Sequence, residues 1–296
     1  MAEAAVARPE AEHSWLDTAR DPRTREVLLA HPDFPRALAR LAAGMTGLYS
    51  GNRLLNRLLS DRGRNVFGLL LLYLDALPPA EGGGLTAARL AGLCTMTGLC
   101  SRGRAKAILA LMRWGGYVAP AAPGDDRRIK PLVPQPRLYA LQKSRWTVLF
   151  GAIGLIDPDM ARVPARLDDD AFVRALVIVL AQSYCAGYRV ISAAPVLDDL
   201  VDHDSALMVL LMLLASEGNG TAPPAIADLA RRFHVSRAHV LHLLRLCEER
   251  GLVERGARGA GRLSPAGRDA LAQFFAGIFA LMAGAARAAE ARLLAA

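Results

Sequence analysis

The stretch from Ser101 to Val118 reads SRGRAKAILALMRWGGYV, and the stretch from Ser236 to Val253 reads SRAHVLHLLRLCEERGLV. The two align without a gap at an offset of 236 − 101 = 135 residues. Each has a serine, a basic first turn, apolar residues at helical spacing, a glycine and a short β-prone tail. Because serine favours the N-cap of a helix and glycine its C-terminal end, each copy predicts an amphipathic helix followed by a strand.

Further helical patterns precede each copy, and a hairpin pattern follows it. The predicted helices cover residues 65–77 and 87–94 before the first copy, and 205–216 and 225–233 before the second. After each copy, a polar tip at 123–128 or 256–261 separates two short strands. Three helices followed by a two-stranded wing make a winged helix-turn-helix, whose recognition helix enters the major groove of DNA. The sequence therefore predicts a mainly α fold with short β wings, in which a helical scaffold joins two winged helix-turn-helix domains.

The chain divides into five predicted parts around this repeat. They are an N-terminal arm and helical extension (1–64), the first winged helix-turn-helix (65–137), a helical linker or scaffold (138–203), the second winged helix-turn-helix (204–264) and a C-terminal helix (265–296). We expect residues 1–30 to form a loose polar arm with room for a short helix around Arg23–Ala30. The apolar stripe of the C-terminal helix includes Phe274, Phe275 and Phe279, and it serves either the chain's own core or dimerisation.

The composition favours long helices and an anionic partner. Only 6% of the 296 residues are aromatic, and the formal net charge is +8. A basic balance favours nucleic acid or an anionic membrane surface as the partner. The alternative is a genome of high GC content, which enriches all proteins in Arg and Ala and gives the same balance without such a partner. The most apolar runs, Gly68–Leu74 and Ala206–Ala215, are too short to span a bilayer. The N-terminal MAEAAVARPEAEHSW has no apolar secretion region, so we expect a cytoplasmic, nucleoid-associated protein with no membrane partner.

No residue pattern predicts a metal or a cofactor. The four cysteines, Cys94, Cys100, Cys185 and Cys247, form no CxxC pair and have no histidine at metal-ligand spacing. We expect them to be small core residues. The alternative is a redox role for Cys100, because a helix N-terminus and Arg102 next to it would favour the thiolate.

The acidic clusters are interpreted as helix starts rather than catalytic or metal sites. Asp168–Asp170 precedes a strongly apolar helical pattern, where negative charge suits the positive end of the helix dipole. Asp202 and Asp204 are likewise expected to cap a helix beside a solvated His203. No nucleophile–base pattern occurs in the sequence, so we predict that the protein is not an enzyme.

Residues 226–255, IADLARRFHVSRAHVLHLLRLCEERGLVER, and 262–271, RLSPAGRDAL, resemble the winged-helix transcription regulators of the MarR and PadR type. Members of those families follow the wing with a junction similar to LSPAGR at Leu263–Arg268. The tip DDRR at Asp125–Arg128 resembles the acidic-then-basic wing tip of MarR proteins. The resemblance implies DNA binding, a wing arginine in the minor groove and pairing as a homodimer. This chain departs from those regulators by carrying two modules where they usually carry one.

The predicted DNA contacts come from the first turns of the two repeated helices and from both wings. Residues at the start of a recognition helix usually meet base edges, and arginine pairs bidentately with guanine. Basic wing residues lie over the minor groove or the backbone. The predicted contacts of the first unit are Ser101, Arg102, Arg104, Lys106, Arg127, Arg128 and Lys130. Those of the second unit are Ser236, Arg237, His239, His242, Arg255, Arg258 and Arg262.

Three functions fit these predictions. The first is a bacterial, sequence-specific transcription regulator, expected as a homodimer on double-stranded DNA, whose modules contact half-sites about 34–36 Å apart. The second is a replication- or partition-type protein that binds DNA repeats. The third is an adaptor whose winged helices bind only protein, since a fold does not determine a function. No residue marks a small-molecule effector site, although an apolar pocket beside the scaffold helices is compatible with one.

Overall fold

The computed structural model describes residues 14–122, 130–218, 220–256 and 261–295. Helices make up 73% of the chain and strands 4%, and the strands form two small antiparallel sheets. The prediction of a mainly α fold with short β elements is therefore confirmed.

The α-helices are α1 (Ser14–Arg20), α2 (Pro22–Ala30), α3 (Phe34–Tyr49), α4 (Arg53–Leu59), α5 (Arg62–Ala76), α6 (Ala87–Met96), α7 (Arg102–Trp114), α8 (Pro136–Ile153), α9 (Val163–Arg166), α10 (Asp170–Cys185), α11 (Ala206–Gly218), α12 (Ile226–Phe233), α13 (Arg237–Glu249) and α14 (Pro265–Leu294). The strands are β1 (Val118–Pro120), β2 (Leu132–Pro134), β3 (Val253–Glu254) and β4 (Arg262–Leu263). Short 3-10 helices are η2 (Pro79–Glu81), η3 (Pro158–Arg162), η4 (Val190–Ala193), η5 (Pro195–Leu197) and η6 (Leu200–Asp202).

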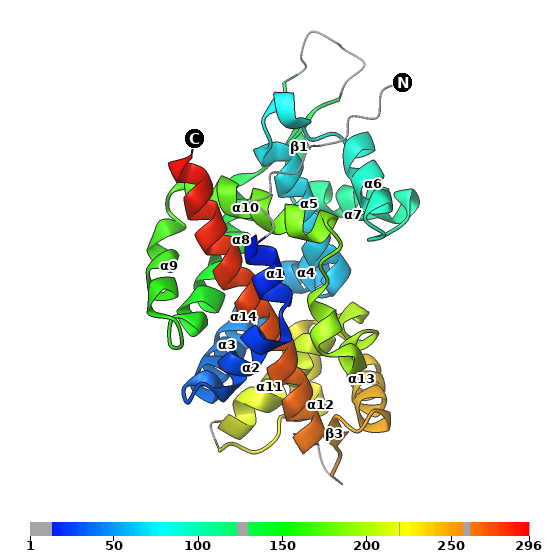
Figure 1. Cartoon of the computed structure of the whole chain (residues 1–296). Coiled ribbons are helices and arrows are strands. Elements are labelled where there is room, and N and C mark those ends of the chain that lie inside the picture. The colour runs from blue at the N-terminus through cyan, green and yellow to red at the C-terminus, as the bar shows by residue number, and fades with distance from the viewer. Residues whose placement is uncertain (1–13, 123–129, 219, 257–260, 296) are drawn as a thin grey trace.

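Helix α14 runs along most of the length of the molecule, and α1, α2, α8 and α10 pack against it (Figure 1). Its start is fixed by Ser264, whose Oγ accepts a hydrogen bond from the Gly267 amide at 2.9 Å, and by Pro265 in the first turn. Helix α3 packs in turn against α8 and α11. Most of the buried apolar side chains of α3, α8, α10, α11 and α14 belong to one continuous apolar core, which holds the scaffold together.

Residues 14–30 form two helices on the scaffold. Helix α2 contains the short helix expected around residues 23–30, whereas the prediction of a loose arm was wrong for residues 14–22, which include α1. Leu16 and Ala19 of α1 are buried. The ring of Trp15 lies so close to α14 that a Cβ on Gly284 would come within 2.8 Å of it. The segment is polar in composition, but these few contacts with the alanine- and glycine-rich surface of α14 are enough to dock it. Residues 1–13 lie outside the described part of the chain.

The aromatic stripe of α14 is used inside the chain. Phe274, Phe275 and Phe279 are all buried, and the ring of Phe279 meets that of Phe34 edge-on with centroids 5.8 Å apart. The stripe was expected either to pack on the chain's own core or to form a dimer interface, and in this structure its phenylalanines pack on the chain's own core. The homodimer stays a prediction that this stripe does not support.

Helix α14 is also the one helix in the described residues that is long and apolar enough to cross a membrane. However, 67% of its apolar window is buried inside the protein, as in a core helix. Its length and composition are therefore only weak evidence of a membrane span.

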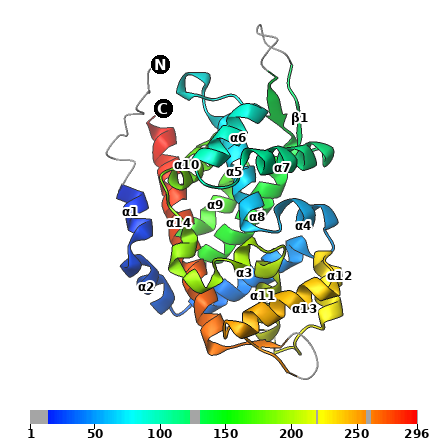
Figure 2. The same ribbon diagram turned by 90° about the vertical axis from the view of Figure 1, so that its right-hand side faces the viewer.

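Two units with the same order of elements lie on one side of the scaffold. The first unit contains α5, α6, α7 and the β1–β2 hairpin, and the second contains α11, α12, α13 and the β3–β4 hairpin. Figure 2, which faces this side, shows α7 and α13 in the two halves of the molecule, with the hairpins extending toward opposite ends. In the first unit, a bridge between Thr86 and Pro131 adds the segment before α6 to the edge of the hairpin.

Candidate nucleic-acid interface

The sequence repeat has the same local structure in both units. Ser101 and Ser236 cap α7 and α13, because the Oγ of each accepts a hydrogen bond from the amide three residues later, at 3.3 Å and 3.0 Å. Gly116 and Gly251 follow the helices with φ of 69° and 68°, a left-handed conformation that favours glycine. The buried positions also match in pairs, namely Ala105 with Val240, Ile108 with Leu243, Leu109 with Leu244 and Met112 with Cys247. The backbone and the core of the two helices are therefore equivalent.

Helix α7 presents a basic surface without acidic neighbours on the same helix. Arg102, Arg104, Lys106 and Arg113 are exposed, and the helix contains no Asp or Glu. Within the described part of the chain, none of these four side chains forms an ion pair with a carboxylate. Lys130, close to β2, is exposed as well. Such uncompensated positive charge on an exposed helix favours contact with phosphates and base edges.

Helix α13 has a different environment. Arg237 is exposed at its start, as predicted for a DNA contact. By contrast, Nε2 of His239 lies 2.9 Å from the main-chain oxygen of Asp204, so this imidazole already has a partner inside the protein. His242 is exposed, and its ring meets that of His203 with centroids 5.9 Å apart. The two histidines thus face the segment that precedes α11.

The wing residues fall into three groups. Arg127, Arg128 and Arg258 lie outside the described residues. Arg262 is exposed on β4, where it remains accessible to a partner. Arg255 is half-buried and pairs with Glu248 of α13 at 3.2 Å, so part of its charge is compensated within the chain.

Ion pairs connect the segment 198–204 to both units. They join Arg62 to Asp198 and Asp202 at 2.6 Å each, Arg64 to Asp204 at 2.9 Å, and Arg250 to Asp199 at 3.1 Å. The interpretation of Asp202 and Asp204 as helix-capping acids was therefore wrong. Their carboxylates bind arginines of α5 that lie 140 residues earlier in the chain.

Two exposed arginines on these helices were missed by the sequence analysis, which considered only the first turn of each helix. Arg113 follows Lys106 by seven residues, and Arg245 follows Arg237 by eight. Both intervals correspond to about two helical turns, so helical periodicity alone would have found them. They extend the candidate surface along α7 and α13.

The cysteines divide between the core and the surface. Cys94 and Cys247 are buried, as expected, and burial raises the pKa of each thiol to about 12. Cys185 is exposed, so the prediction of a core role was wrong for it. Among the described residues, no group of three or more His, Cys, Asp and Glu side chains is placed to hold a metal ion.

No family model, no curated protein and no solved structure matches this chain. The resemblance to MarR and PadR regulators therefore stays a prediction that rests on the quoted residues. The function has to be argued from the two units themselves.

Proposed function

We propose that this protein is a DNA-binding transcription regulator in which each unit acts as a winged helix-turn-helix. The observation that carries the proposal is the exposed basic surface of α7, formed by Arg102, Arg104, Lys106 and Arg113. It begins at a capped helix N-terminus, where the helix dipole adds positive potential to the side-chain charges. A recognition helix contacts base edges and phosphates through residues at this end.

The placement of the two units supports the same proposal. Helices α7 and α13 lie on one side of the scaffold, and the hairpins extend away from each other toward the two ends (Figures 1 and 2). Two recognition helices can meet a single duplex only if they lie on the same side of the protein, and this placement is compatible with that requirement. One chain would then present two half-site contacts, which single-module regulators achieve by pairing. A nucleoid-associated location follows from the proposal.

The test is the binding of the full chain to duplex DNA, measured by fluorescence anisotropy across a range of salt concentrations. Four phosphate contacts from α7 alone predict that the logarithm of the affinity falls with the logarithm of salt with a slope of about −3.6. Arg237→Ala should lower the affinity for an operator fragment without a change in helical content or unfolding midpoint. Arg162→Gln, at an exposed arginine of η3, is the matched control and should leave the affinity unchanged.

The outcome also separates the alternatives. Failure to bind DNA at any salt concentration would contradict the proposal and favour an adaptor that binds protein through the same units. If DNA binding is found, mapping of bound sites across a genome distinguishes isolated promoter sites, expected for a regulator, from iterated repeats, expected for a replication- or partition-type protein.

A further inference from the structure

A cavity of about 290 Å³ lies at the centre of the scaffold, outside the candidate DNA-binding surface. Its wall is built by α3, α8, α10 and α14 of the scaffold together with α5 and α11, the first helices of the two units. The size is close to the lower end of the range for small-molecule sites, about 300–1,000 Å³. A ligand in this cavity would therefore touch the scaffold and both units at once.

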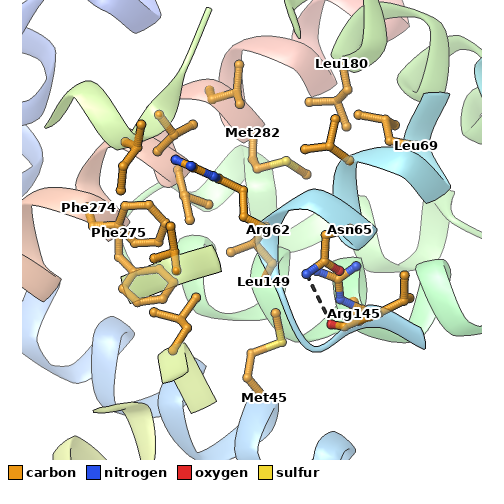
Figure 3. A pocket seen from close by; sticks show the side chains of 18 of the residues that line it. Met45, Arg62, Asn65, Leu69, Arg145, Leu149, Leu180, Phe274, Phe275 and Met282 are labelled. Atoms are coloured by element: carbon orange, nitrogen blue, oxygen red, sulfur yellow. Dashed lines mark hydrogen bonds between the residues drawn. The ribbon is translucent and has the colours of Figure 1, made fainter. Parts of the chain in front are cut away.

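Most of the wall is apolar. Figure 3 shows Leu69, Leu149, Leu180 and Met282 around one part of the cavity and Phe274 and Phe275 at another. These side chains come from α5, α8, α10 and α14. A surface of this kind favours the body of an apolar molecule, because burying apolar area removes it from water.

One end of the cavity is polar and has unused hydrogen-bonding capacity. Nε of Arg145 is buried without a partner, while its Nη1 donates to Gln142 at 3.2 Å. Asn65 Nδ2 donates to the main-chain oxygens of Leu59 and Asp61, at 3.2 Å and 2.8 Å, which determines the orientation of the amide. The Asn65 Oδ1 is then the atom left buried without a donor. Both residues line the cavity, and each keeps one buried polar atom without a partner, a charged donor on Arg145 and a neutral acceptor on Asn65.

The charges around the cavity favour an anion. Arg145 and Arg189 both line it, and within the described chain neither has a carboxylate partner. Arg62 is compensated by Asp198 and Asp202, and the Asp61 carboxylate, which also lines the cavity, is compensated by Arg64 at 3.2 Å. The excess of positive charge therefore comes from Arg145 and Arg189. A carboxylate that accepts a hydrogen bond from a guanidinium is among the strong interactions available to a buried arginine.

We propose that the cavity binds an apolar hydroxy acid, with its carboxylate on Arg145, its hydroxyl donating to Asn65 Oδ1 and its hydrocarbon chain along the leucines and phenylalanines. The carboxylate uses the free Nε–H of Arg145, and the hydroxyl supplies the donor that Asn65 lacks. A carboxylate alone would leave Asn65 Oδ1 unsatisfied, and a neutral diol would leave the arginine without a counter-ion.

The structure also connects the cavity to the DNA-binding surface. Arg189 donates through Nη2 to the main-chain oxygen of Thr97 at 2.9 Å, and Thr97 is the C-cap of α6, immediately before the turn into α7. Arg62, at the start of α5, also lines the cavity and forms ion pairs with Asp198 and Asp202. These two residues lie just before Asp204, whose main-chain oxygen contacts His239 of α13. We therefore expect the ligand to change DNA affinity, a step that rests on the proposed function.

The test is isothermal titration calorimetry of the full chain with β-hydroxydecanoate, decanoate and the diol of the same chain length. β-Hydroxydecanoate should bind best. Arg145→Met should weaken it by about tenfold to hundredfold, the range for a hydrogen bond to a charged group, while changing diol binding less than about threefold. Arg162→Met, which removes an exposed arginine outside the cavity, should leave all three affinities unchanged.

A second variant, Leu149→Trp, fills the cavity from α8 and should abolish binding of all three compounds. Wild-type affinity for β-hydroxydecanoate in Arg145→Met would overturn the proposal, and so would equal affinities for the acid and the diol in the wild-type chain. Circular dichroism checks that each variant folds. If Leu149→Trp does not fold, the result for Arg145→Met alone decides whether the proposal holds. Because calorimetry needs no DNA, a chain that binds the acid but no DNA refutes the proposed function and leaves the cavity assignment standing.

Discussion

Helices α7 and α13 have the same length, the same serine cap and buried side chains at the same positions, but their surfaces differ in charge. Helix α7 carries four basic residues and no acidic one. Helix α13 carries Arg237 and Arg245 together with Glu248 and Glu249, so its formal charge is balanced. The requirements of packing and capping are thus met identically, whereas the exposed residues, which packing does not constrain, have diverged.

The surroundings of the two helices differ in the same direction. The basic side chains of α7 have no ion-pair partners among the described residues, whereas residues on and just after α13 are held by the segment 198–204. His239 binds the Asp204 main-chain oxygen, and Arg250 pairs with Asp199. We infer that α7 supplies most of the electrostatic attraction to DNA, and that α13 contributes a less charged contact.

The largest expected effect comes from removing charge on α7. The triple variant Arg102→Gln, Arg104→Gln, Lys106→Gln should weaken DNA binding by about hundredfold and reduce the salt slope by about 2.7, or 0.9 for each lost phosphate contact. The matched double variant on α13, Arg237→Gln with Arg245→Gln, should reduce the slope by clearly less than about 1.8, the value for two full phosphate contacts. Anisotropy titrations at several salt concentrations measure both slopes. Equal losses per residue on the two helices would contradict the unequal division of electrostatic work.

The equivalence of the two backbones predicts equal effects on stability. Ser101→Ala and Ser236→Ala each remove the acceptor for an N-terminal amide of the helix, and each should lower the free energy of unfolding by about 1 kcal/mol. Urea unfolding followed by circular dichroism measures the two losses. Serine-to-glycine variants at the same sites are the controls and should cost only a few tenths of a kcal/mol. A loss confined to one helix would show that the repeat is not equivalent in stability.

The parts of the structure that the sequence predicted are those determined by local signals. Ser101 and Ser236 were placed correctly as N-caps, because capping needs only the neighbouring amides. The acidic run before α10 also caps its helix, since Asp169 accepts a hydrogen bond from the Ala171 amide at 2.9 Å. By contrast, the helical periodicity of α14 did not show which residues would bury its aromatic stripe, because residues such as Phe34 lie far away in the sequence.

The remaining features depend on residues far apart in the chain. The pairing of Arg62 with Asp202 joins positions 140 residues apart, and no local pattern indicates it. The docking of α1 on α14 and the central cavity arise in the same way, from the packing of several helices. For the candidate site, the sequence identified Arg102, Arg104 and Lys106 of α7, but neither Arg113 nor the contact of His239 with the Asp204 main-chain oxygen.

His239 gives a smaller and more specific test of the difference between the helices. His239→Ala removes the contact with the Asp204 main-chain oxygen and should lower the free energy of unfolding by about 1 kcal/mol. Because the imidazole is engaged inside the protein, DNA affinity should change by less than about threefold. His242→Ala, at an exposed position on the same helix, is the control for stability and should change it by less than about 0.5 kcal/mol. A large loss of DNA affinity with unchanged stability would instead make His239 a DNA contact.

The first helices of the two units, α5 and α11, begin with different residues, and this difference should make the stability of the protein depend on pH. Asp61 caps α5 through a hydrogen bond from the Arg64 amide at 2.7 Å, whereas Ser205 precedes α11 with its hydroxyl buried and unpartnered. Burial raises the pKa of the Asp61 carboxyl above its ordinary value of 3.8, so the folded chain holds this proton more tightly than the unfolded chain. The contribution of Asp61 to stability is therefore greatest below pH 3.8, and it declines as the pH rises through the raised value.

Asp61→Asn keeps a cap but cannot titrate, so its stability relative to the wild-type chain should increase from about pH 4 toward neutral pH. Urea unfolding of both chains across this range measures the difference. Ser205→Ala is the control in the second unit and should change stability by the same amount at every pH. If the difference between Asp61→Asn and wild type is constant with pH, Asp61 does not titrate in this window.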